Sequence, residues 1–369
     1  MARIVPVVDA KPSHLARYLL LAYVLLIIYA SLYPFSGWRD QGVGPFAYLS
    51  ERLPRYITAF DVVTNLIAYI PLGFFALLAL HPQVRGKLAF AAASLTGCVL
   101  SFAMEALQTY LPSRISSNLD FATNSLGAFV GAALALGFGV GLLGRGKMHE
   151  LRHRWVLDGH QYDLGLVLLG LWLFTQLNPA TLLFGNGDLR GLFDDVPAVL
   201  HPAEVFIQME AVVTACNLVA IGLFASCLTR GERPRRGMLL GLLAAALALK
   251  TVAVGELLKA QTEFAWLTPG ALLGLIVGAL VLTLALALPR AARMALAGLL
   301  LMAATVLVNL APENPYFADA LQYWPQGYFL NFNGVTHLVS LAWPFAALFY
   351  LMLLAPRSGS AGRDSRGKL

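Results

Sequence analysis

The sequence predicts an all-α integral membrane protein, a polytopic helical bundle with about ten transmembrane helices. Three observations lead to this fold class: the composition, a series of long apolar runs, and the alternation of basic residues between successive loops. Hydrophobic residues make up 58% of the 369 residues and charged residues only 12%, whereas soluble globular chains have roughly 45–50% and about 25%. This composition excludes a water-soluble domain, and three cysteines are too few for a secreted disulfide scaffold.

The apolar runs are each long enough to cross about 30 Å of hydrocarbon as a helix. The first continues from Leu15 to Leu32, which is longer than the apolar core of a cleavable signal peptide, so we interpret it as a span. Most of the runs contain glycine and several contain proline, which membrane-embedded helices tolerate. In chain order, the predicted spans are residues 16–34, 61–80, 87–108, 120–143, 163–179, 204–228, 237–258, 269–288, 292–311 and 336–355.

Lysine and arginine residues alternate between the two sides that these spans define. Nineteen of them fall on the side that holds both termini, six fall on the opposite side, and Lys250 lies inside a span. Basic residues concentrate in the cytoplasmic loops of membrane proteins, so this bias predicts that both termini are cytoplasmic and that the number of spans is even. Anionic lipid headgroups account for the net charge of +6, and we predict no nucleic-acid partner.

We divide the chain into three parts. Residues 1–147 hold the first four spans, residues 148–356 form a second membrane half with the other six, and residues 357–369 form a disordered cytoplasmic tail rich in Gly, Ser and Arg. Three long loops on the side opposite the termini, near residues 35–60, 180–203 and 312–335, are rich in aromatic residues, proline and glycine. We interpret these loops as aromatic belts at the headgroup level, and a lid over a ligand site is the alternative.

The second half resembles a degenerate internal repeat of the first. Copies that lie four spans apart have the same orientation, which would make this a parallel repeat. Glycines four residues apart in both copies form faces that let helices approach closely. The second copy lacks counterparts of Asp61, Arg114, Asp120 and Asn124, so if the chain is duplicated, the first half kept the site and the second became scaffold. The matching motifs, at offsets of 152, 151 and 147 residues, are Asn65-Leu-Ile-Ala with Asn217-Leu-Val-Ala, Glu105-Ala-Leu with Glu256-Leu-Leu, and the Leu-Gly-x-x-Val-Gly-Ala motifs that begin at Leu126 and Leu273.

Polar residues of three consecutive predicted spans fall at one depth, near the extracytoplasmic ends of these spans. The spacing is i, i+4 for Asp61 with Asn65 and for Asp120 with Asn124, and it is i, i+3 for Glu105 with Gln108. The members of each pair therefore share a helix face. Such side chains are costly against lipid and usually face the bundle interior or a wet cavity. We therefore expect them, together with an arginine in the intervening loop, to form one site. The candidate ligand-binding residues are Asp61, Asn65, Glu105, Gln108, Arg114, Asp120 and Asn124.

Two interpretations of this cluster remain open. In the first it is a structural network, in which Asp61 and Asp120 stabilise helix N-termini and Arg114 pairs with Glu105. In the second it is a polar pocket open to the outer leaflet, in which Arg114 clamps an anion through two hydrogen bonds and the acids bind a cation or an amine. Helix capping does not explain Glu105 or the amides one turn deeper, and this favours the pocket.

These residues form an ordered pattern with neighbouring prolines and glycines: Asp61, Asn65 and Pro71-Leu72-Gly73, then Glu105 and Gln108, then Pro112 and Arg114, then Asp120, Asn124, Gly127 and Gly131. The pattern resembles the VanZ-like family of bacterial membrane proteins, over about residues 15–145. The resemblance implies a multi-pass protein of the cell envelope, in the bacterial cytoplasmic (inner) membrane. The namesake of the family is associated with low-level resistance to the glycopeptide antibiotic teicoplanin, so antibiotic resistance is implied by the resemblance only.

We expect a binding or accessory module that holds a lipid-linked, glycan-type or amphiphilic envelope ligand in the outer pocket. Membrane lipid is the other expected partner, and we expect no cofactor and no resident metal. The sequence contains no recognisable nucleophile–base set and no phosphate-binding loop. These absences favour binding over catalysis.

Two alternative functions follow from other features of the sequence. A secondary transporter is the first, because parallel repeats around polar residues are typical of transporters, and Lys250 with Glu256 would then carry protons. A metal-dependent enzyme acting on a membrane-lipid pyrophosphate is the second, with Asp61, Glu105 and Asp120 holding Mg²⁺ through carboxylate oxygens.

Overall fold

A computed structural model describes residues 13–53, 57–138, 147–190, 202–257, 264–311 and 326–354. Within these residues the regular elements are helices, and no strand occurs apart from one isolated bridge. The chain divides into two compact units, Met1–His153 and Arg154–Leu369, close to the boundary predicted after residue 147. The tail predicted at residues 357–369 lies outside the described residues.

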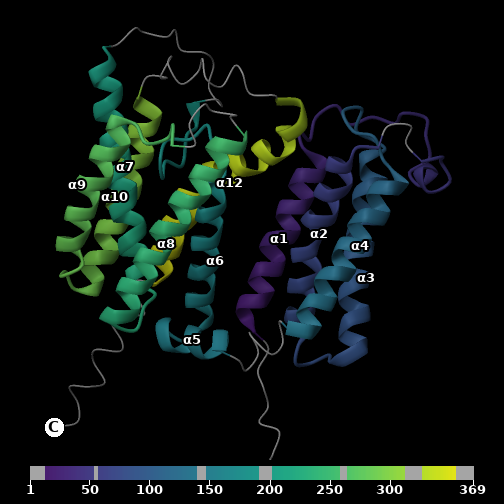
Figure 1. The fold of residues 1–369 in the computed structure, drawn as a ribbon, viewed down its shortest axis with the longest axis horizontal. Helices are drawn as coiled ribbons and strands as arrows, with labels where there is room; N and C mark the ends of the chain where they lie inside the picture. Colours follow the sequence, from purple (N-terminus) through teal and green to yellow (C-terminus); the bar gives the residue numbers. More distant parts are fainter. Residues whose placement is uncertain are drawn as a thin grey trace, which may run out of the picture. The chain divides into compact units, whose positions relative to one another are not determined.

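The N-terminal unit contains four long helices that lie side by side (Figure 1). They are α1 (His14–Leu32), α2 (Ala59–Leu80), α3 (Gly86–Gln108) and α4 (Asn118–Leu134), and a short 3-10 helix, η1 (Ala47–Leu49), lies between α1 and α2. Ser13, Thr58 and Ser117 cap α1, α2 and α4, because each side chain accepts a hydrogen bond from a first-turn N–H. Helix α2 is central and contacts the other three helices.

Glycines allow α2 and α4 to pack backbone against backbone. A methyl group at Gly131 would overlap the carbonyl oxygen of Ile70, and one at Gly73 would overlap the carbonyl oxygen of Ala128. Membrane helices use small residues in this way for close association. The approach also brings the polar side chains near the N-termini of α2 and α4 within hydrogen-bonding reach of each other.

The C-terminal unit is built around α7 (Ala203–Ser226), which contacts α8, α9 and α10. Phe184, Phe224 and Trp343 fill its core, and the Trp343 Nε1 donates to the carbonyl of Leu168 (2.7 Å). The remaining elements are α6 (His160–Thr175), α8 (Glu232–Val252) with its π-helical extension η4 (Ala253–Leu257), α9 (Pro269–Ala285), α10 (Arg290–Leu310) and α12 (Gln326–Leu354), while α5 (Lys147–Trp155) crosses the boundary between the units.

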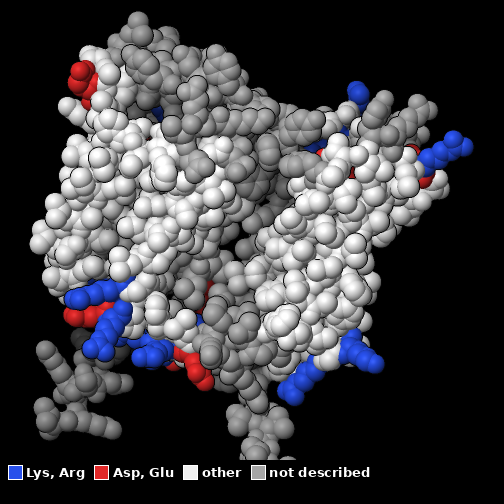
Figure 2. Space-filling view, in the orientation of Figure 1, with Lys and Arg blue, Asp and Glu red and all other residues white. Residues whose placement is uncertain are grey.

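Eight of the described helices are long and apolar enough to cross a membrane. A helix lies at each of the ten predicted spans; of the two that are not among the eight, α9 has 17 residues and α6 has 16. Figure 2 shows that the helix flanks carry few charges and that Lys and Arg side chains gather at helix ends. The chain is therefore a multi-pass helical membrane protein, and the predicted fold class is confirmed.

The connection after α6 differs from the prediction. The sequence predicts a surface loop near residues 180–203, but residues 176–190, which we call the buried segment, enter the interior of the C-terminal unit. Gln176, Asn178, Phe184 and Asn186 are all nearly inaccessible to solvent. A buried, non-helical backbone must find partners for its N–H and C=O groups, and the loop-like composition gives no indication that such partners exist.

Neighbouring helices supply these partners. Asn309 of α10 donates to the carbonyl of Gly187 (2.7 Å). Ser340 of α12 donates to Asn186 Oδ1 (3.0 Å), and the Ser340 carbonyl accepts the N–H of Gly187 (2.9 Å). Gly187 has a φ of +80°, which glycine adopts without strain. The buried segment is thus part of the core of this unit and not a belt on its surface.

Each glycine motif of the predicted repeat packs on a helix of its own unit, and the two motifs pack at different positions relative to Asn65 and Asn217. Gly127 packs against Leu66, directly after Asn65, whereas Gly274 packs against Ala211, well before Asn217. The motifs that match in sequence are therefore not at equivalent positions relative to the two asparagines. The internal repeat remains a prediction.

Candidate functional site

The predicted ligand-binding residues lie at one end of the N-terminal unit. Asp61 and Asp120 are in the first turns of α2 and α4, and Glu105 and Gln108 are in the last turn of α3. Arg114 lies in the loop between α3 and α4. The antiparallel course of consecutive helices places these ends together, and we call Asp61, Asn65, Glu105, Asp120 and Asn124 the acidic cluster.

Asn65 and Asp120 join α2 to α4 within this cluster. The Asn65 Nδ2 donates to Asp120 Oδ1 at 2.8 Å. A carboxylate only accepts hydrogen bonds, so the amide nitrogen of Asn65 must face Asp120 and the Asn65 Oδ1 must face away. Asp61 is exposed at the edge, where its carboxylate accepts from the Thr58 hydroxyl (2.6 Å).

Glu105 is the most deeply buried acid of the cluster, at 3% exposure. Its Oε2 accepts the N–H of Ser117 (2.9 Å), the N-cap residue of α4. Its backbone carbonyl accepts from the hydroxyls of Ser116 (2.9 Å) and Thr109 (3.3 Å). The carboxylate therefore orients the start of α4 while its Oε1 accepts no hydrogen bond within the described part of the chain.

Asn124 lies one turn deeper than Asp120 and is 6% exposed. Its Nδ2 donates to the hydroxyl of Ser101 on α3 (3.1 Å). Its Oδ1 is buried and accepts no hydrogen bond from any residue the structure describes. Buried polar atoms nearly always have a partner, so this unpaired oxygen marks a position where a water or a ligand group is expected.

Arg114 does not face the acids, and the expected pairing with Glu105 is wrong. Its Nε and one terminal nitrogen donate to the carbonyl of Tyr33 (3.1 and 2.6 Å), and that nitrogen also donates to the carbonyl of Ala30 (3.1 Å). No ion pair joins Arg114 to the acids of the cluster among the described residues. Burial lowers the pKa of Arg114, but a guanidinium stays protonated in proteins.

Arg114 and Gln108 instead hold the end of α1. The last carbonyls of a helix have no intrahelical donor, and Arg114 supplies donors to two of them. Gln108 Nε2 donates to a third carbonyl, that of Ser31 (3.0 Å). Both residues therefore fix α1 against the loop beside the acidic cluster.

We expect Arg114→Ala to lower the free energy of unfolding of the N-terminal unit by about 2 kcal/mol, because hydrogen bonds to charged groups contribute roughly 1.5–3 kcal/mol each. Arg114→Lys should recover only part of this loss, since an ammonium cannot reproduce the planar fork. Thermal unfolding in detergent micelles measures the effect, with the exposed Arg52→Ala as control. Equal melting temperatures for Arg114→Ala and Arg52→Ala would contradict this role.

Two hydroxyl residues of the site were not among the sequence candidates. A serine three residues before an acid at a helix start is typical of an N-cap, and this signal identifies Ser117. Ser101 carries no such signal, because a small hydroxyl residue inside an apolar run is common in membrane helices. Only the packing of α3 on α4 shows that it binds Asn124.

The acids of the cluster are not placed together as a metal-binding group within the described residues. No group of three or more His, Cys, Asp or Glu residues in the described ranges is placed to hold a metal ion. Asp120 uses one oxygen for Asn65 and Glu105 uses one for Ser117. The arrangement therefore gives no support to the alternative in which these acids bind Mg²⁺.

Lys250 is a buried charged residue of the C-terminal unit. The sequence places Lys250 inside a span, and in the structure its ammonium donates to the carbonyls of Asn178 (2.8 Å) and Thr181 (2.5 Å) of the buried segment. The acid whose charge acts on it is Glu210 of α7. The side chain of Glu256, its expected partner, lies outside the described residues.

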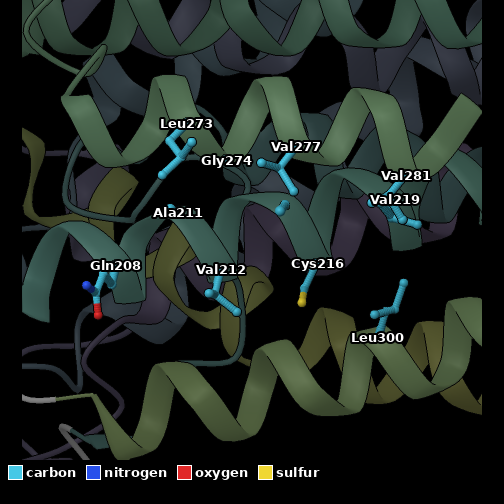
Figure 3. A pocket seen from close by; sticks show the side chains of 11 residues that line it. Gln208, Ala211, Val212, Cys216, Val219, Leu273, Gly274, Val277, Val281 and Leu300 are labelled. Carbon is cyan, nitrogen blue, oxygen red and sulfur yellow. The ribbon is translucent and has the colours of Figure 1, made fainter.

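An apolar hollow of about 390 Å³ lies between α7, α9 and α10 (Figure 3). Its walls are mostly aliphatic, and Gln208 lies at one end. None of the predicted ligand-binding residues lines it. A cavity without convergent polar groups suits a hydrocarbon chain and provides no catalytic chemistry.

Long apolar helices with basic ends define a polytopic membrane protein, and a polar cluster lies where three of the helices of its N-terminal unit end. Residues 17–140, about a third of the chain, match the family model described as VanZ/LLP1. The N-terminal unit is therefore similar to the VanZ-like family, and the match confirms the resemblance seen in the sequence. Neither the search of curated proteins nor that of solved structures gave a match.

Proposed function

We propose that the VanZ-like unit binds the polar headgroup of an amphiphilic envelope molecule, lipid-linked or glycan-type, at the acidic cluster. The observation that carries this proposal is the set of unused acceptor atoms in a buried site, above all the Asn124 Oδ1 and the Glu105 Oε1. Satisfied buried networks stabilise a fold, whereas partly satisfied networks are costly. A bound headgroup would supply the missing donors.

The charge pattern supports an outer-leaflet position for this site. The acidic cluster lies where α2 and α4 begin and α3 ends. Over the whole sequence six Lys and Arg residues, among them Arg39, Arg52 and Arg114, fall on this side of the predicted spans, and nineteen fall on the other side. Basic residues favour the cytoplasmic side, so the cluster belongs to the extracytoplasmic boundary. A headgroup at that level would leave its hydrocarbon tail among the lipids.

Glu105→Ala tests the proposal. It removes a buried acceptor and loosens Ser117, and we expect the affinity for the ligand to fall about 10- to 100-fold. Bacterial total polar lipid is added to the purified full-length protein, and native mass spectrometry measures the lipid retained. Glu51→Ala is the matched control, because Glu51 is an exposed acid near the same helix ends. If the Glu105→Ala variant retains as much lipid as the wild-type protein, this result would count against the proposed site.

Transport is the second candidate function, and one observation favours it. A lysine buried beside a non-helical segment, with an acid near it, resembles the coupling sites that form around interrupted helices in transporters. Glu210 takes the place of Glu256 in this proposal. Substrate flux into liposomes that is unchanged in a Lys250→Met, Glu210→Gln double variant would remove this candidate.

A further inference from the structure

We infer that the acidic cluster selects a headgroup that carries a primary ammonium. The inference rests on the proposed function, because it assigns the chemical class of the ligand to the same site. Three features of the described residues carry it. The charged residues of the cluster are acids, its free hydrogen-bonding atoms are acceptors, and the Asn124 Oδ1 is buried and unpaired.

The charged residues of the cluster itself are all acids: Asp61, Glu105 and Asp120. Asp120 acts electrostatically on Glu105, and Asp61 acts electrostatically on Asp120. Neither Lys nor Arg forms an ion pair with these acids in the part of the chain that the structure describes. Like charges in a partly buried site repel one another, so a cation bound among them would be stabilised.

The free hydrogen-bonding atoms of the cluster are acceptors. Glu105 Oε1, Asp120 Oδ2 and Asn65 Oδ1 accept no hydrogen bond from a described residue, since the hydrogen bonds of these side chains use their other polar atoms. The unpaired Asn124 Oδ1 is an acceptor as well. A primary ammonium offers three N–H donors and a positive charge and no acceptor.

Other headgroups satisfy this arrangement less well. A phosphate or a carboxylate would add negative charge and further acceptors. A sugar hydroxyl can donate, but it brings no charge to balance the acids. A quaternary ammonium has the charge but no N–H donor, so comparing it with a primary ammonium separates hydrogen bonding from charge alone.

The test uses full-length protein and three lipids with identical acyl chains: phosphatidylethanolamine, phosphatidylcholine and phosphatidylglycerol. We expect phosphatidylethanolamine to bind at least about tenfold more tightly than the other two, as charge-assisted hydrogen bonds contribute more than neutral ones. Asp120→Asn should abolish this preference, because it removes the charge while an amide oxygen still accepts from Asn65. Glu51→Gln is the control and should keep the preference.

The outcomes separate this inference from the proposed function. If all three lipids bind equally and Glu105→Ala weakens all of them, the site stands and the ammonium inference fails. Tighter binding of phosphatidylglycerol would also overturn the ammonium inference. If none of the three lipids binds, both the proposed headgroup site and the ammonium inference fail for these lipids. Free ethanolamine, added as a competitor, distinguishes a lipid headgroup from a soluble amine as the ligand. If ethanolamine displaces phosphatidylethanolamine at a concentration comparable to that of the lipid, the ammonium chemistry is supported but the ligand is a soluble amine.

Discussion

Replacing Lys250 by methionine will lower the free energy of unfolding of the C-terminal unit by about 3–5 kcal/mol, the range found when one partner of a buried charged network is removed. Lys250 is 1% exposed. Its ammonium donates to the carbonyls of Asn178 and Thr181 and to the Thr181 hydroxyl (3.3 Å). Methionine fills similar space without a donor, so the Thr181 carbonyl loses its partner and Glu210 loses its nearby cation.

Unfolding in mixed micelles of rising SDS content measures this effect. Arg233→Met, an exposed position on the same helix, is the control and should change stability by less than about 0.5 kcal/mol. A Lys250→Met, Glu210→Gln double variant should be more stable than the sum of the single changes predicts, because it removes the uncompensated acid as well. Wild-type stability of Lys250→Met would show that the buried segment does not depend on this lysine.

Gly131→Ala will destabilise the N-terminal unit by about 3 kcal/mol, at the upper end of the usual range for overpacking. The added methyl group would overlap the carbonyl oxygen of Ile70, which belongs to the α2 backbone and cannot rotate away. The helices must therefore separate. Because Asn65 of α2 reaches Asp120 of α4 across this interface, ligand retention should fall together with stability.

Gly137→Ala provides the matched control. Gly137 lies shortly after α4, and an added methyl group there would meet no atom within 4 Å. Glycine costs up to about 1 kcal/mol relative to alanine in a helix, so this substitution should be neutral or slightly stabilising. If the two variants unfold alike, close packing of α2 on α4 is not what holds the unit together.

Helix positions could be predicted well from the sequence, because each span is a continuous apolar run whose length is set by the bilayer. The buried segment could not. Its Asn, Pro, Thr and Gly residues are typical of a surface loop, and their burial depends on Lys250, Asn309 and Ser340, which come from helices far along the chain.

The site was predicted in part. Helical spacing placed the residues of the acidic cluster on shared faces, and the order of the helices placed those faces at one end. The partner of Arg114 did not follow from this, because an arginine near acids and near open helix carbonyls has two sets of acceptors. Its position in the loop after α3 brings it to the carbonyls of Ala30 and Tyr33 instead.

The sequence by itself determined that this protein is a membrane-spanning helical chain with a VanZ-like pattern of polar residues, because hydropathy and helical periodicity are local properties. The tertiary structure alone decided which of these polar groups are satisfied. A hydrogen bond needs two groups at a set distance and angle. For Arg114 and Lys250 the second group lies on another element of the fold, and for the Asn124 Oδ1 no described residue supplies one.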